Sequence, residues 1–73
     1  SAPDGDELRR RREAVGISQR DLAAASGLSR GLVAEVERGR RRHVMTRARI
    51  AETLASVAAE KGISLDTDTS VAV

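Results

Sequence analysis

The sequence predicts an all-α domain, a compact bundle of four or five helices, from two observations. Residues that favour a helix N-terminus recur, and each precedes a helix-compatible run: Asp4, Ser18, Ser29 and Thr46. Glycines that can end a helix come after these runs: Gly16, Gly27, Gly39 and Gly62. Between these signals apolar residues recur at helical spacing, and no segment alternates strongly enough for a sheet.

The first helix is expected to begin after Asp4 and to run to about Val15. Asp4 and Glu7 form a capping-box pattern, in which side chains satisfy the free backbone N–H groups of the first turn. Leu8 and Val15 lie two turns apart and form the apolar side of this helix. The segment 1–3 before it is expected to be a flexible tail.

Two short helices are expected next, over about 19–25 and 30–37, with Ser18 and Ser29 as their N-caps. The turn between them is Ser-Gly-Leu at 26–28, where the leucine can pack against the core.

The stretch 19–38 has the spacing of two helices joined by a tight turn. Its fifth residue, Ala23, is small where the second helix must cross closely. Its ninth, Gly27, can supply the positive φ of the turn. Val33 and Val36, three apart on the second helix, face the core. The outer face of that helix therefore remains free to enter a groove of DNA.

The basic segment RRRHVM at 40–45 is expected to be a loop. Thr46 then caps a longer helix over about 47–61. An apolar stripe at helical spacing marks the core side of this helix: Ile50, Leu54, Val57 and Ala58. The domain is expected to span 4–65, and 66–73 is expected to be a C-terminal tail.

Positive charge is concentrated in the middle of the chain, although the net charge is only +2. Residues 1–29 hold five arginines and five acids, residues 30–49 hold seven arginines and two acids, and residues 50–73 hold one lysine and four acids. Arginine binds phosphate and guanine well because its planar fork can bond two acceptors. The pattern favours a polyanionic partner bound near 30–49.

Other functional classes find little support in the composition. The chain has no cysteine and one histidine, His43, so neither a disulfide nor a metal site is expected. No glycine-rich phosphate loop and no catalytic constellation can be assembled, so we expect neither an enzyme nor a cofactor. No membrane span or signal peptide is recognisable, which favours the cytoplasm and the nucleoid. The first residue, Ser1, is not methionine, which leaves open a fragment of a longer protein.

The chain resembles the Cro/repressor-type (XRE-like) helix-turn-helix family of bacterial and phage transcription regulators. The resemblance is carried by LRRRREAVGISQRDLAAASGLS, RGLVAEVERG, IAETL and GISLD, between Leu8 and Asp66. It implies a lambda-repressor-like bundle that binds operator DNA, commonly as a dimer on a twofold site. The chain departs from the family in lacking a proline after Gly39 and in its extended fourth helix.

The resemblance also implies roles for individual residues. Candidates for contacts with bases are Arg30, Gly31, Glu35, Arg20 and Ser29. Candidates for contacts with phosphates are Gln19, Arg38, Arg40, Arg41, Arg42 and His43. Arg30 is the foremost base contact, with a phosphate contact as the alternative. Glu35 either accepts a bond from cytosine or orients a neighbouring arginine. The run Arg9–Arg12 is either a solvated face or a contact with flanking DNA backbone.

The sequence supports two functional hypotheses. The first is sequence-specific binding of double-stranded DNA by a transcriptional regulator, a repressor, whose recognition helix is about 30–37. The alternative is a protein-interaction module of the same fold, antitoxin-like or an adaptor, that uses the fourth helix and the C-terminal tail. A homodimer, weak or formed only on DNA, is compatible with either hypothesis, and we expect no membrane partner.

Overall fold

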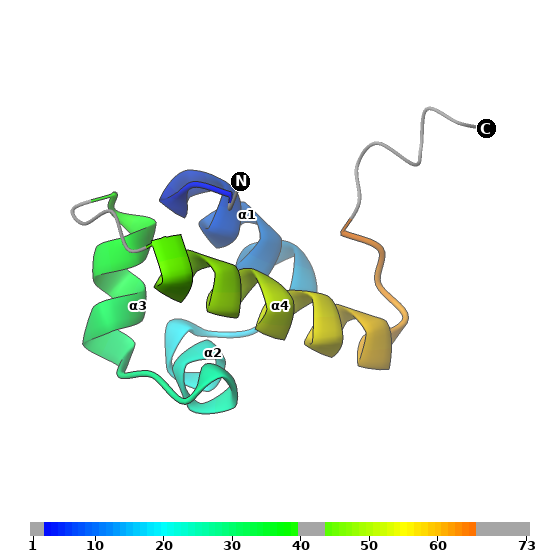
Figure 1. Cartoon of the computed structure of the whole chain (residues 1–73). Helices are drawn as coiled ribbons and strands as arrows, with labels where there is room; N and C mark the ends of the chain where they lie inside the picture. The colour runs from blue at the N-terminus through cyan, green and yellow to red at the C-terminus, as the bar shows by residue number, and fades with distance from the viewer. Residues whose placement is uncertain (1–2, 40–43, 66–73) are drawn as a thin grey trace.

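The computed structural model describes residues 3–39 and 44–65, which form four α-helices and no strand (Figure 1). In chain order the helices are α1 (Gly5–Val15), α2 (Gln19–Ser26), α3 (Arg30–Glu37) and α4 (Val44–Lys61). The predicted all-α bundle is confirmed. No fifth helix begins within these described ranges, and residues 66–73 lie outside them.

Three of the predicted N-caps are confirmed by their hydrogen bonds. Asp4 accepts from the backbone N–H of Glu7 at 2.9 Å. The Ser18 and Ser29 hydroxyls accept from the N–H groups three residues further on, at 3.0 and 3.1 Å. Each bond satisfies a donor in the first turn that has no partner within the helix. The start of each of the first three helices is therefore fixed by a local interaction.

The turn between α2 and α3 depends on Gly27. Its φ is 71°, in the left-handed region that residues with a Cβ rarely adopt. The chain reverses there, and the N–H of Leu28 donates to the carbonyl of Ala23 at 2.9 Å. This bond satisfies one of the last carbonyls of α2 and places Leu28, half-buried, against the core.

Two predicted boundaries are wrong. Thr46 does not cap α4, because that helix already includes Val44 and Met45. No glycine or proline stands between Gly39 and Thr46 to interrupt a helix, so the capping preference of threonine did not decide the start. Helix α2 extends one residue beyond the prediction, to Ser26, and Gly27 ends it in the left-handed conformation.

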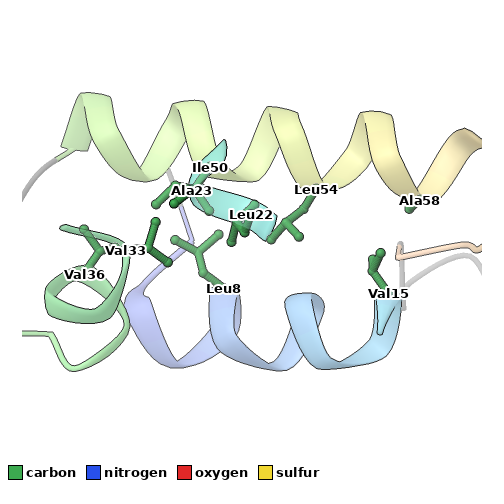
Figure 2. Close-up of a cluster of buried hydrophobic side chains, with 9 residues drawn as sticks. All are labelled: Leu8, Val15, Leu22, Ala23, Val33, Val36, Ile50, Leu54 and Ala58. Carbon is green, nitrogen blue, oxygen red and sulfur yellow. The ribbon is translucent and has the colours of Figure 1, made fainter. Parts of the chain in front are cut away.

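In Figure 2 the core lies between α4 and α1, with the α3 side chains at one end and those of α2 in the middle. Its nine buried hydrophobic residues come from all four helices: Leu8, Val15, Leu22, Ala23, Val33, Val36, Ile50, Leu54 and Ala58. Val57, predicted on the same stripe, is half-buried at the edge of this core. Each helix thus depends on the others, which holds α2 and α3 at a fixed angle.

Helix α1 contacts α3 at an unusually close approach. Gly5, the first residue of α1, is buried, and a Cβ at this position would overlap the carbonyl oxygen of Val36. The first turn of α1 therefore rests directly on the backbone of the last turn of α3. Sequence analysis did not identify this requirement for glycine.

Candidate nucleic-acid interface

The predicted base-contacting residues lie together on the outer face of the helix-turn-helix. Ser29, Arg30 and Gly31 are exposed at the start of α3, and Arg20 is exposed in the first turn of α2. Glu35 is half-buried one turn further along α3 and takes part in an interaction of its own. The Ser29 hydroxyl caps α3 as an acceptor, so its O–H remains able to donate to a DNA acceptor.

Two surface hollows share Gln19 and Arg30 in their linings, and together they are called the groove here. One hollow lies along α3 and is lined by Gln19, Arg30, Gly31, Ala34, Glu35 and Arg38. The other lies over the start of α2 and is lined by Arg12, Ser18, Gln19, Arg20 and Arg30. The fold therefore brings the beginning of α2 beside the outer face of α3. Residues predicted to contact bases and residues predicted to contact phosphates lie next to one another there.

Three arginines of this groove have no acceptor among the described residues. In the part of the chain that the structure describes, Arg20, Arg30 and Arg38 make neither an ion pair nor a side-chain hydrogen bond. All three are exposed. Guanidinium groups that lack a partner remain available for phosphate or guanine, both of which accept two bonds.

The arginines of α1 are arranged differently. Arg9 pairs with Asp6 at 3.0 Å, Arg10 pairs with Asp6 and Glu7 at 3.0 Å, and Arg11 pairs with Glu7 at 3.1 Å. Hydrogen bonds from Arg10 and Arg11 lower the pKa of Glu7. Such exposed pairs add little stability, but they offset most of the positive charge of these three arginines. The solvated-face interpretation therefore suits Arg9 to Arg11.

Two arginines in the first half of α4 bond to backbone carbonyls. Arg47 Nη1 donates to the carbonyl of Pro3 at 3.4 Å, and Arg49 Nη1 donates to that of Ser26 at 3.5 Å. Both bonds are long and tie α4 to the N-terminus of the chain and to the end of α2. These two arginines contribute positive charge, but they are less available to bind an anion than the arginines of the groove.

A buried ion pair behind the groove was missed by sequence analysis. Arg12 Nε donates to Glu37 Oε2 at 2.7 Å, and Arg12 Nη2 donates to Glu37 Oε1 at 3.2 Å. Gln19 Nε2 also donates to Glu37 Oε1, at 3.0 Å. The side chain of Glu37 is only 3% exposed and that of Arg12 14%. One carboxylate therefore joins α1, α2 and α3.

This network fixes the orientation of groups that face the groove. The hydrogen bond with Glu37 raises the pKa of Arg12, whereas desolvation opposes the charged form. Arg12 Nη1 also donates to the carbonyl of Ile17 at 3.0 Å, which holds the segment before α2. Because Gln19 is bonded to Glu37, its amide is held in place at the start of α2. Its predicted phosphate contact remains a prediction.

One signal for Glu37 was present in the sequence. Glu37 lies four residues after Val33 and one after Val36, so helical spacing places it on the core side of α3. A carboxylate on that side requires a cationic partner. Spacing alone does not identify Arg12, which lies 25 residues earlier in the chain.

The remaining predicted phosphate contacts lie outside the described residues: Arg40, Arg41, Arg42 and His43. Within residues 3–39 and 44–65, no group of histidine and acidic side chains is arranged to hold a metal ion. No helix in these described ranges has the length and apolar character required to span a bilayer.

Comparison with known proteins identifies the family to which the domain belongs. A family model described as a helix-turn-helix domain matches residues 5–64, from the first residue of α1 to beyond the end of α4. The chain therefore belongs to the helix-turn-helix domain family. This membership indicates a DNA-binding, regulatory role. Comparisons with curated proteins and with solved structures gave no match.

Proposed function

We propose that this chain binds double-stranded DNA sequence-specifically, with α3 in the major groove, and acts as a transcriptional repressor of the Cro/repressor type. The observation that supports this proposal is the groove along α2 and α3. It gathers three exposed arginines that lack an acceptor within the described protein, Arg20, Arg30 and Arg38. Occupying an operator with such a face would block access of other proteins to the same DNA.

Within this proposal, the position of each groove residue determines whether it contacts a base or a phosphate. Arg30, in the first turn of α3, bonds guanine O6 and N7 in the major groove. Arg38, beyond the end of α3, and Gln19, at the start of α2, bond phosphates on either side. The N–H groups at the start of α2 favour an anion as well. Arg20 supplies a further base or phosphate contact.

Selection of bound sites from a pool of random duplexes tests this function. We expect enrichment of a short sequence that contains guanine, and repression when this sequence is placed across a promoter in a reporter strain. A wild-type protein that is folded but binds no duplex at moderate salt would contradict the proposal. A purely protein-binding module would give that result.

Arg30→Ala is expected to lose sequence preference. Removing a bidentate guanine contact should reduce the discrimination between the selected site and a site lacking that guanine by about 1–3 kcal/mol. Competition binding with both duplexes measures this difference directly. If Arg30 instead contacts phosphate, affinity for both duplexes will fall equally and their ratio will remain.

Arg38→Ala is the matched control, since it also removes one exposed arginine of the groove. It should weaken binding to all sequences alike and should reduce the salt dependence by about one unit of slope. For the wild type, neutralisation of about six phosphates predicts a slope of log K against log salt near −5.

Gly31→Ala should separate helix stability from DNA contact. No atom lies within 4 Å of a Cβ built at Gly31, so the methyl group fits without rearrangement. Alanine should therefore stabilise α3, raising the free energy of unfolding by about 0.5–1 kcal/mol. If Gly31 permits close approach to DNA, affinity will nevertheless fall. Thermal unfolding and duplex titration of the same variant distinguish the two effects.

A further inference from the structure

Gly31 is the only one of the six glycines for which the fold gives no reason. Four have a φ between 71° and 84° and follow a helix: Gly16, Gly27, Gly39 and Gly62. Gly5 has no room for a Cβ. Gly31 lies inside α3 and has no such φ, and apart from its own helical turn no described atom lies within 4 Å of a Cβ built there. Because glycine weakens a helix relative to alanine, its presence points to a contact with another molecule.

Gly31 lies at the middle of the outer face of α3. With about 3.6 residues per turn, it is roughly 140° around the helix from Val36 and roughly 200° from Val33, both of which are buried. Ala34 is its neighbour three residues further on, and both residues line the hollow along α3. Longer side chains complete that lining: Gln19, Arg30, Glu35 and Arg38. The hollow therefore has a floor of one glycine and one alanine within a rim of longer, polar side chains.

This floor favours an apolar group on the DNA. Neither Gly31 nor Ala34 has a side-chain donor or acceptor, so a polar base edge placed on them would lose its hydrogen bonds to water without replacement. The major groove presents one apolar group, the methyl group at C5 of thymine, and alanine is one of the residues that contact it. 5-Methylcytosine carries the same group at the same position. The floor therefore suits a C5-methylated pyrimidine.

We propose that the floor formed by Gly31 and Ala34 receives the C5-methyl group of a pyrimidine near the guanine that Arg30 contacts. This inference rests on the proposed function and adds a second specified base to it. Along the axis of α3, Gly31 and Ala34 lie about 1.5 and 6 Å from Arg30, and successive base pairs lie about 3.4 Å apart. The methyl group therefore belongs to a base pair within about two steps of that guanine.

Thymine suits the rim of the hollow better than 5-methylcytosine does. Beside the methyl group, thymine presents the acceptor O4, whereas 5-methylcytosine presents the N4 amino group, which is a donor. Arg30 and Arg38 on the rim offer donors only, and neither has an acceptor among the described residues. We therefore expect thymine at this position, with 5-methylcytosine as the other source of the same group.

Duplexes that differ by a single methyl group test this contact. In the site obtained from the selection, uracil replaces the thymine near the guanine, which removes the C5-methyl group and nothing else. We expect affinity to fall about fourfold, as for the loss of one buried methyl-sized group. The same replacement at a thymine in the flanking DNA is the control and should have no effect. Duplexes with cytosine and with 5-methylcytosine at this position identify the source: methylation should raise affinity about fourfold, and thymine should bind most tightly.

Gly31→Ala tests the same contact from the protein side. Its Cβ raises the floor of the hollow, so the base edge no longer reaches it, and the difference between the thymine and uracil duplexes should disappear. The matched control is Ala55→Leu, which adds apolar atoms at an exposed position of α4 outside the hollow. This control should keep the difference between the two duplexes. Thermal melts of both variants verify that they are folded.

Three outcomes would overturn the inference. Equal affinity of the wild type for the thymine and uracil duplexes would mean that no methyl contact exists, and a Gly31→Ala variant that retains the difference would place the contact elsewhere. A preference for unmethylated cytosine would assign the position to Glu35 as an acceptor. Tighter binding of 5-methylcytosine than of thymine would support the methyl contact and change only its source. In all these cases DNA binding itself remains, whereas a wild type that binds no duplex would contradict the proposed function.

Discussion

Glu37→Ala is expected to lower the free energy of unfolding by about 3 kcal/mol. The substitution leaves the Arg12 guanidinium, whose side chain is 14% exposed, without its carboxylate. It also removes the acceptor of the Gln19 amide. A domain of this size has a total stability on the order of 3–5 kcal/mol, so the variant should be partly unfolded at 37 °C. Urea and thermal melts monitored by circular dichroism measure the loss.

The control for this prediction is Glu60→Ala, at an exposed acid of α4 that forms no salt bridge within the described residues. It should change stability by less than about 0.5 kcal/mol. Replacing both members of the pair, Arg12→Leu with Glu37→Leu, should restore much of the loss, because no buried charge remains. Equal stability of wild type and Glu37→Ala would contradict the prediction, because it would mean that Arg12 loses its carboxylate at no cost.

The helix starts could be predicted because they depend on local interactions. Asp4, Ser18 and Ser29 each accept a hydrogen bond from an N–H only three residues away, so the signal lies within a few residues of sequence. The core positions Val33 and Val36 are predicted by helical periodicity in the same way. The helix-turn-helix is recognisable for this reason, since its caps, turn and core positions fall within about twenty residues.

The features that sequence analysis missed depend on contacts between distant segments. Arg12 meets Glu37 across 25 residues, and Gly5 meets Val36 across a similar separation. Helical spacing shows that Glu37 faces the core but does not identify its partner. The run Arg9–Arg12 looks uniform in sequence, yet three members pair within α1 and the fourth reaches α3. The different role of Arg12 becomes evident only from the packing of α1 against α3.

Gly5→Ala is expected to destabilise the domain by about 2 kcal/mol, although alanine favours a helix. A Cβ at this position would overlap the carbonyl oxygen of Val36 and would lie 3.0 Å from that of Glu37. The Val36 carbonyl cannot simply turn away, because it accepts from the N–H of Gly39 at 3.0 Å. The first turn of α1 must therefore move off the end of α3. Chemical denaturation of the variant measures the cost.

Gly31→Ala is the matched comparison, since the same substitution at an unobstructed position should raise stability. Opposite signs for the two variants would attribute the loss at Gly5 to the contact with α3. A neutral Gly5→Ala would mean that the two helices can separate slightly at no cost. Because Gly5 and Glu37 both hold the C-terminal end of α3, far from Arg30, Gly5→Ala should also reduce DNA affinity at temperatures where it remains folded. That reduction would come from tilting of α3, without the loss of any side chain that contacts DNA.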